Sequence, residues 1–313
     1  MNRFDGVINV ANSSAEVKQT YPIQSILADI KSLIKGLVLV ANVLPVLAGF
    51  WLATYFTDAT ISEHFDTFLL TMIGSTFVIA GALMLNNWYE VDLDKEMLRT
   101  KNRPTVTGHF SLKSVLIAGI VSSLLGFTLM LFTTLEATIY AFLGWFTYIV
   151  LYTFWSKRRY TLNTVIGSIS GAFTPLIGWA AITSAYHIVP ITLFIILFIW
   201  QIPHTFAIAI RRYEEYKAAG VPMLPVVAGF EITKRQTIIY IACLLPFPFL
   251  LSSLGNIFLT IAFILNVCWL IVGIRGFFKK DDKKWADMNF YFSLTYLTVV
   301  FFTMMIVTFP GIF

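Results

Sequence analysis

Apolar residues run along this chain in long blocks, each separated from the next by a short polar or charged stretch. A block of about 20 apolar residues is long enough to cross the hydrocarbon of a bilayer as an α-helix. The pattern predicts nine such helices, at residues 36–55, 67–88, 114–133, 137–155, 162–183, 188–210, 238–253, 256–275 and 289–312. We therefore expect an all-α, polytopic membrane protein, with a polar arm at residues 1–30 and one transmembrane domain at residues 31–313.

Several of the predicted helices contain proline. Pro45, Pro175, Pro190 and Pro203 lie in helix interiors, where a bilayer helix tolerates a kink if neighbouring helices satisfy the carbonyl groups that the ring frees. We therefore expect kinks at these four positions. The seventh helix, at 238–253, is short and contains Pro246 and Pro248, which leaves its limits open.

The composition agrees with a bilayer as the main solvent. The chain is 58% hydrophobic and 12% charged, with a mean hydropathy of +0.77, whereas soluble domains average about 25% charged residues. Cys243 and Cys268 both lie in apolar runs, which favours packed thiols over a disulfide or a metal site. The first 30 residues lack the short apolar run and cleavage site of a signal peptide, so we expect none.

The charges of the loops predict the orientation in the membrane. All 22 Lys and Arg fall in the polar arm, in the loops after the second, fourth, sixth and eighth helices, or within about one turn of them. The 56–66 loop carries only acidic charges, and the 134–136 turn carries only Glu136. Because basic loops stay in the cytoplasm, we expect a cytoplasmic N-terminus, cytoplasmic even-numbered loops and an external Phe313. The net charge of +5 thus indicates membrane topology, and we expect no nucleic-acid partner.

A dense charged segment, "NNWYEVDLDKEMLRTKNRP" at 86–104, follows the second helix. Asn86, Glu90 and Asp94 are spaced by four, which places them on one face of a helix. Two carboxylates and an amide suit Mg²⁺, which prefers oxygen ligands and often bridges carboxylates to phosphates. The cations that follow suit the phosphates themselves: Arg99, Lys101 and Arg103. The simpler alternative is a solvated loop whose cations only set the topology.

A second mixed segment follows the sixth helix on the same predicted side. It supplies another acid for metal and more cations for diphosphate: Arg211, Arg212, Glu214, Glu215 and Lys217. An ordinary helical ion pair between Arg211 and Glu215 is the alternative. The third cytoplasmic loop, Lys157–Arg159, is most simply a topology signal. We expect the two mixed segments to form the two lips of one site.

Two polar residues lie inside predicted membrane helices. His204 follows Pro203 in "WQIPH", and a histidine within a membrane helix is either a functional group or a core residue bonded to a carbonyl that the proline frees. Asn42 is most simply a contact that holds helices together. The abundant aromatic rings between the lips could line a tunnel for a lipid tail and stabilise a carbocation.

Several motifs, in order, resemble one family. "NNWYEVDLDKEMLRTKNRPTVTG", "NTVIGSISGAFTPLIGW", "WQIPHTFAIAIRRYEEYKAAGVPMLP" and "GFEITKRQ" are similar to stretches of the intramembrane UbiA-type prenyltransferases, and more closely of their haem O synthase branch. The resemblance covers nearly the whole chain after about residue 25 and looks closest to Gram-positive bacterial members. It implies nine helices around a central lipid-facing cavity, in the bacterial plasma membrane, with the active site on the cytoplasmic side.

The resemblance also implies a reaction. Farnesyl diphosphate is the donor, haem b is the acceptor and Mg²⁺ assists the departure of diphosphate. A haem vinyl group attacks the allylic carbon and water completes the addition. A haem A synthase is a candidate partner.

The family's functional residues carry over by position. Asn86, Glu90 and Asp94 match the first metal motif, which Asp92 also fits, and Glu215 falls in the second. His204 matches the histidine of the haem branch. The diphosphate-binding set is basic: Arg99, Lys101, Arg103, Arg211 and Lys217.

This chain departs from the family pattern at three points. The middle acid of the first motif is usually Asp and here is Glu90, and two prolines usually precede "LIGW" where this chain has Thr174 and Pro175. The second motif is not a clean D-x-x-x-D, which leaves Glu214 and Glu215 both open as the metal ligand.

Three other functions stay open. They are prenylation of a quinone precursor, transport, and haem binding by a catalytically impaired relative. "WQIPH" and "AGVPMLP" resemble the haem branch and weigh against the first. Charges that gather at helix ends rather than at the bilayer midplane weigh against the second. Only Glu90 and Thr174 support the third.

Overall fold

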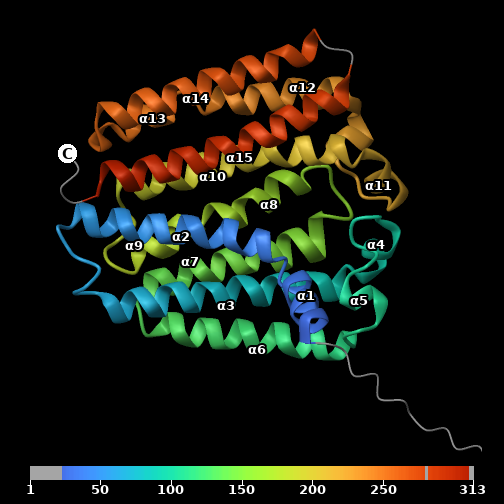
Figure 1. Ribbon diagram of the computed structural model, residues 1–313, viewed down its shortest axis with the longest axis horizontal. Coiled ribbons are helices and arrows are strands. Elements are labelled where there is room, and N and C mark those ends of the chain that lie inside the picture. Colours follow the sequence, from blue (N-terminus) through green and yellow to red (C-terminus); the bar gives the residue numbers. More distant parts are fainter. Residues whose placement is uncertain (1–22, 279–280, 310–313) are drawn as a thin grey trace, which may run out of the picture.

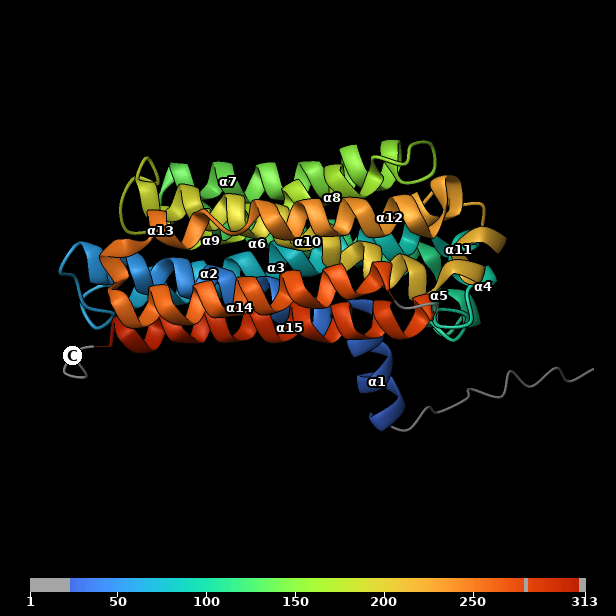
Figure 2. The ribbon, with the colours of Figure 1, turned by 90° about the horizontal axis from the view of Figure 1, so that it is seen from above.

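The structure is a computed structural model that describes residues 23–278 and 281–309. The part of the chain it describes is all-helical, as the hydropathy pattern predicts, and forms one bundle of long helices with nearly parallel axes (Figures 1 and 2). The bundle consists of α2 (Gly36–Phe56), α3 (Phe65–Tyr89), α6 (Leu112–Leu131), α7 (Leu135–Phe146) with the π-helix η1 (Thr147–Ser156), α8 (Asn163–Ala172), α9 (Thr174–Ala180), α10 (Ile188–Arg211), α12 (Leu224–Cys243), α14 (Asn256–Ile274) and α15 (Asp282–Val307). Shorter elements join them: α1 (Ile23–Leu33), α4 (Val91–Glu96), α5 (Pro104–Thr107), α11 (Tyr213–Ala218), α13 (Phe247–Leu250) and 3₁₀ turns at Ser252–Leu254 and Arg275–Phe277.

Seven helices within the described ranges are individually long and apolar enough to cross a membrane, so the predicted count of nine is not confirmed. The predicted fifth helix is two helices, because α8 ends at Ala172 and α9 begins at Thr174, with Pro175 in its first turn. The predicted seventh helix corresponds to α12, which spans Leu224–Cys243 but is broken at Gly229 (φ 79°, ψ 173°), so its continuous part begins at Phe230 and ends at Cys243, before Pro246. At Pro175 the chain thus changes from one helix to the next where we expected a kink, whereas Pro45 and Pro203 lie inside the helices α2 and α10.

The predicted polar arm and the chain end fall partly outside the described residues. Residues 1–22 of the arm and residues 310–313, including Phe313, are not described. Within the described part of the arm, α1 is a short helix beside the bundle (Figure 2).

The charged segments gather at one end of the bundle. Figure 1 shows α4, α5 and α11 together at this end, while α15 ends at the other. The two segments predicted as lips of one site are therefore on the same side, and we call this the loop end of the bundle.

Two glycines let α2 and α9 pack backbone to backbone. A Cβ atom added to Gly49 would lie 2.1 Å from the carbonyl oxygen of Pro175, and one added to Gly178 would lie 1.9 Å from that of Val46. Small residues permit such close approach, which drives helix association inside a bilayer. The break between α8 and α9 is thereby anchored against α2.

We predict that Gly178→Ala lowers the free energy of unfolding by at least about 1–3 kcal/mol, since the added methyl group forces two backbones apart. Thermal unfolding in detergent measures the effect. Gly144→Ala is the matched control, because its Cβ would lie 3.3 Å from the nearest atom, the carbonyl oxygen of Ser170. Equal unfolding temperatures for the two variants would contradict the packing argument.

Candidate active site

The first acidic segment keeps helical spacing across the junction of α3 and α4. The amide of Glu90 donates to the carbonyl of Asn86 at 3.0 Å, and the amide of Asp94 donates to the carbonyl of Glu90 at 2.9 Å. The three side chains therefore follow one another on one face, as their spacing predicts. All three are buried, with at most 3% of the residue exposed. A solvated loop would leave them exposed, so the simpler alternative does not describe these three residues.

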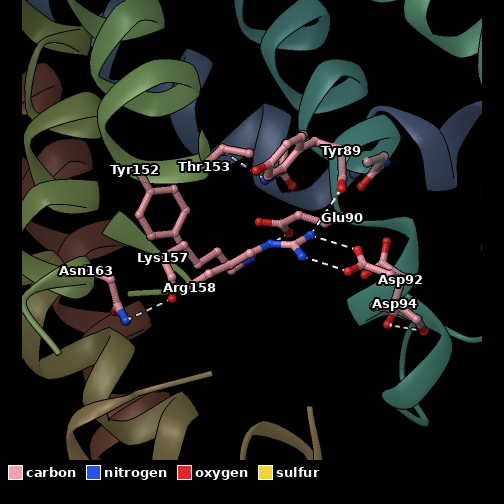
Figure 3. Close-up of polar contacts among 12 residues, drawn as sticks. Tyr89, Glu90, Asp92, Asp94, Tyr152, Thr153, Lys157, Arg158 and Asn163 are labelled. Atoms are coloured by element: carbon pink, nitrogen blue, oxygen red, sulfur yellow. Dashed lines mark hydrogen bonds and ion pairs between the residues drawn. The ribbon is translucent and has the colours of Figure 1, made fainter. Parts of the chain in front are cut away.

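Each buried acid or amide meets a cation from another part of the chain. The ammonium of Lys157 donates to Glu90 Oε2 at 2.5 Å, and the guanidinium of Arg103 donates to Asp94 Oδ2 at 2.6 Å. Lys35, at the junction of α1 and α2, donates to Asn86 Oδ1. Figure 3 shows Lys157 and Glu90 directed toward each other across the space between η1 and α3.

These groups surround a small polar cavity of about 40 Å³ at the loop end. Its walls combine acids, cations and a few apolar side chains: Lys35, Glu90, Leu93, Asp94, Met97, Arg99, Arg103, Lys157 and Tyr216. With four cations against two carboxylates, the walls carry a positive excess that suits an anion of several charges. We call this cavity the charged pocket.

Glu90 fits a role as a metal ligand. Its Oε1 is buried and has no hydrogen-bond partner among the described residues. A buried carboxylate oxygen without a hydrogen-bond partner lowers the stability of the fold unless a ligand binds to it. Within the described residues, no group of three or more His, Cys, Asp or Glu lies close enough to hold a metal. The carboxylates of Glu90 and Asp94 are the oxygen donors that Mg²⁺ prefers, and this ion takes further ligands from water and phosphate.

The pKa of each ionisable group in the charged pocket depends on the charges of its neighbours. Burial alone would raise the pKa of the Glu90 carboxyl, but the ammonium groups of Lys157 and Lys35 hold that pKa below its usual value. Burial likewise opposes the charge of Lys157, yet the Glu90 carboxylate raises the pKa of this amine above its usual value. Burial and then the repulsion of Arg103 lower the pKa of Lys35 to about 7. A bound anion would therefore restore the full charge of Lys35.

Asp92 lies apart from the other acids of its segment. Both of its oxygens accept from the guanidinium of Arg158 at 2.7 Å, and 60% of its side chain is exposed. Figure 3 shows Arg158 bridging from the end of η1 to this carboxylate and to the backbone of Tyr89. This bidentate pair joins the third basic loop to α4 and lies beside the charged pocket.

The second acidic segment contributes only Tyr216 to the lining of the pocket. Glu215 accepts from Arg212 at 2.9 Å, and Arg211 pairs with Asp287 of α15 at 2.6 Å. Glu214 and Lys217 are exposed. The metal and diphosphate roles of Glu214, Glu215, Arg211 and Lys217 stay predictions, as does that of Lys101, which is also exposed.

A larger cavity of about 210 Å³ lies deeper in the bundle. Its walls are mainly apolar and aromatic, with a few polar groups, and include Asn42, Trp145, Tyr148, Tyr152, Thr174 and Gln201. Tyr152 lies between the two cavities, since the ammonium of Lys157 is 5.5 Å from the centre of its ring. Both tyrosines belong to η1, and π-helical turns are rare and frequent at functional sites.

His204 lies between α10 and α15 and lines neither of these two cavities. Its ring is stacked between those of Trp200 and Phe290, with centroids 4.9 and 5.1 Å away, and its Nδ1 is 2.7 Å from Ser293 Oγ. A haem-binding role for His204 stays a prediction.

Sequence reasoning missed several residues of these cavities. Lys35 lies just before the first predicted helix and Lys157 in the third basic loop, and we interpreted both cations only as topology signals. Because all 22 Lys and Arg fall on the same predicted membrane side, charge alone does not single these two out. Nothing in the sequence distinguishes the cavity residues Tyr148, Tyr152 and Gln201 from the many other aromatic and polar residues of the membrane helices.

Comparisons with known proteins agree with these features. The sequence model of the UbiA prenyltransferase family matches residues 42–295. The chain is 54% identical to a protoheme IX farnesyltransferase of Oceanobacillus iheyensis, over 99% of both chains. It is 49% identical to one of Bacillus cereus, over 99% of this chain and 100% of the relative.

Solved structures share the fold at low sequence identity. A digeranylgeranylglyceryl phosphate synthase matches 91% of this chain and 99% of its own, with a TM-score of 0.70 and 18% identity. A UbiA homologue from Archaeoglobus fulgidus, bound to DMAPP and Mg²⁺, matches 87% of this chain and 99% of its own, with a TM-score of 0.62 and 15% identity.

Proposed function

The chain belongs to the UbiA prenyltransferase family, and we propose that it transfers a farnesyl group from farnesyl diphosphate to a vinyl group of protohaem IX (haem b), giving haem O. The observation that carries this proposal is the identity of 54% and 49%, over the full length, to two proteins named protoheme IX farnesyltransferase. The charged pocket suits the diphosphate of a prenyl diphosphate, and the apolar cavity below it suits the prenyl chain.

The diphosphate binds in the charged pocket. Lys35, Arg99, Arg103 and Lys157 line it and donate to phosphate oxygens, with Arg suited to bidentate contacts. Glu90 and Asp94, which contact Lys157 and Arg103 in the same pocket, would hold Mg²⁺. When bound, this ion offsets the negative charge that develops on the leaving diphosphate.

The farnesyl chain occupies the larger cavity. Heterolysis of the C1–O bond leaves both bonding electrons on diphosphate and a positive charge on the allylic carbon. The rings of Tyr148 and Tyr152 line the cavity next to the charged pocket, where their faces stabilise this charge. The electron pair of a haem vinyl group then forms the new carbon–carbon bond, and water adds to the resulting cation with loss of a proton.

The location follows from the charge distribution. The protein is a multi-pass membrane protein, and we place it in the bacterial plasma membrane with the loop end in the cytoplasm. This orientation opens the diphosphate subsite to the cytoplasm. A haem A synthase, which would receive the product, is the protein partner we propose.

A mass spectrum of the product tests the function. Membranes that contain the protein are incubated with haem b, farnesyl diphosphate and Mg²⁺, with EDTA and boiled membranes as controls. We expect a haem product heavier by one farnesyl group plus one hydroxyl group, and no product with EDTA, because without the metal ion nothing offsets the negative charge of the two carboxylates beside the leaving diphosphate. A folded protein that makes no such product, but prenylates a quinone precursor, would overturn the choice of acceptor.

A further inference from the structure

Helix α1 buries Leu33 against the bundle and leaves its other large apolar side chains from Ile26 onward exposed. Ile26, Leu27 and Ile30 lie within an arc of one face and are 41%, 62% and 44% exposed. Asp29 and Ser32, on the opposite side, are half-buried against the bundle. A surface helix of a soluble protein has the reverse arrangement. The outward apolar face therefore requires a nonaqueous neighbour.

The position of α1 identifies that neighbour. In Figure 2, α1 projects from the bundle crosswise to the membrane helices, on the side toward the loop end. Its apolar face continues into exposed apolar residues of the first turns of α2, where Leu37 is 84% and Val40 is 67% exposed. These belong to a helix long and apolar enough to cross the membrane. A helix with this orientation and continuity suits the boundary between lipid headgroups and acyl chains.

Contacts tie α1 to the charged pocket. Asp29 lies 3.1 Å from Nδ1 of His109, and the side-chain amide of Asn87 donates to the carbonyl of Leu33 at 2.6 Å. The chain then turns through Lys35, a non-glycine residue in the left-handed region with φ of 47°. Such a conformation persists only where the surroundings determine it. The Lys35 side chain enters the charged pocket next to Asn86.

We propose that α1 is a membrane-interface helix that docks its apolar face into the phospholipid leaflet at the loop end, and that this docking holds Lys35 in the charged pocket. Lys35 is then a positioning residue, because contact between α1 and lipid fixes where its ammonium lies in the charged pocket. The second part rests on the proposed function, because it assigns Lys35 to diphosphate. The first part is independent of any activity.

The depth of α1 in lipid is measured without an assay of activity. The full-length protein, with Cys243→Ser and Cys268→Ser, carries a single Leu27→Cys or Ala28→Cys labelled with an environment-sensitive fluorophore in phosphatidylcholine–phosphatidylglycerol vesicles. We expect lipid nitroxides near the headgroups to quench the label at 27, and aqueous iodide to quench the label at 28, which lies on the polar side of α1. Iodide quenching that is equal at the two positions would overturn the proposal.

The coupling to Lys35 is tested by the KM for farnesyl diphosphate. We expect Leu27→Glu with Ile30→Glu to raise this KM about tenfold, the size of coupling usual between residues that act together. Ala28→Glu, an exposed position on the polar side, is the matched control and should change KM less than about twofold.

Adding Lys35→Met to the Leu27→Glu/Ile30→Glu variant decides whether α1 acts through Lys35. If it does, the KM of the triple variant equals that of Lys35→Met alone. If the KM increase of the triple variant is instead the product of the increases of Leu27→Glu/Ile30→Glu and of Lys35→Met, α1 does not act through Lys35. Wild-type protein that makes no prenylated product would instead contradict the proposed function, and the fluorescence result would still decide the place of α1.

Discussion

Glu90→Gln and Asp94→Asn are each expected to lower farnesyl transfer by at least about 100-fold, the usual scale for losing one preorganised charge interaction with a transition state. Both substitutions keep the side-chain volume and remove a negative charge. The two carboxylates are buried, and Oε1 of Glu90 has no partner among the described residues. Loss of either should weaken Mg²⁺ at the leaving diphosphate, so the effect belongs mainly to kcat, with a raised Mg²⁺ requirement.

Glu96→Gln provides the matched control for these two variants. Glu96 lies in α4 with Asp94 but is exposed, so the same chemical change there should leave transfer within about twofold of wild type. Product is measured as farnesylated haem per mole of inserted protein, over a series of Mg²⁺ concentrations. Transfer by Glu90→Gln at the wild-type rate, with an unchanged Mg²⁺ dependence, would remove Glu90 from the metal site.

The bundle was largely predictable because apolar length alone specifies a membrane helix. The predicted helices at 36–55 and 188–210 coincide with α2 and α10 to within one residue at each end. The predicted helix at 162–183 was wrong as a single element, since it is divided between Ala172 and Thr174. The break falls at Pro175, which is visible in the sequence, but the close packing of α2 against Gly178 comes from far away in sequence. A hydropathy profile averages over neighbours in sequence, so it cannot predict a contact between distant residues.

The first half of the site was predictable for a local reason. Asn86, Glu90 and Asp94 share a face because helical hydrogen bonds continue through the junction of α3 and α4, and spacing by four is then sufficient. Their partners were not predictable in the same way. Lys157 comes from the end of η1 and Lys35 from the start of α2, so only the packing of separate helices brings them to the acids.

The second acidic segment shows the limit of spacing arguments. Arg211 and Glu215 are four apart, which suggested an ion pair with each other, yet Arg211 pairs with Asp287 and Glu215 with Arg212. The Arg211 guanidinium also lies 4.1 Å from the centre of the Phe290 ring. Contacts with α15 thus decide where Arg211 points, and the metal role predicted for Glu215 is a matter for experiment.

The charge of Lys157 should matter as much as the acids it faces. We expect Lys157→Met to lower farnesyl transfer by at least about 100-fold, because it removes a cation from the diphosphate side of the pocket. It should also lower the free energy of unfolding by up to about 3–5 kcal/mol, the usual cost of leaving one partner of a buried ion pair unpaired. Thermal unfolding in detergent with EDTA measures that loss. Lys113→Met, at an exposed position of α6 near the loop end, should change neither quantity.

A double variant separates the two roles of Lys157. If the instability of Lys157→Met arises from the unpaired charge of Glu90, then adding Glu90→Gln should restore much of the lost stability, since a neutral pair of similar volume carries no such penalty. Transfer should stay absent, because both the cation and the metal ligand are gone. Lys157→Arg should keep the stability and part of the activity, since it preserves the charge but changes its geometry. A double variant as unstable as Lys157→Met alone would show that the methylene stem of Lys157, and not its charge beside Glu90, stabilises this end of the bundle.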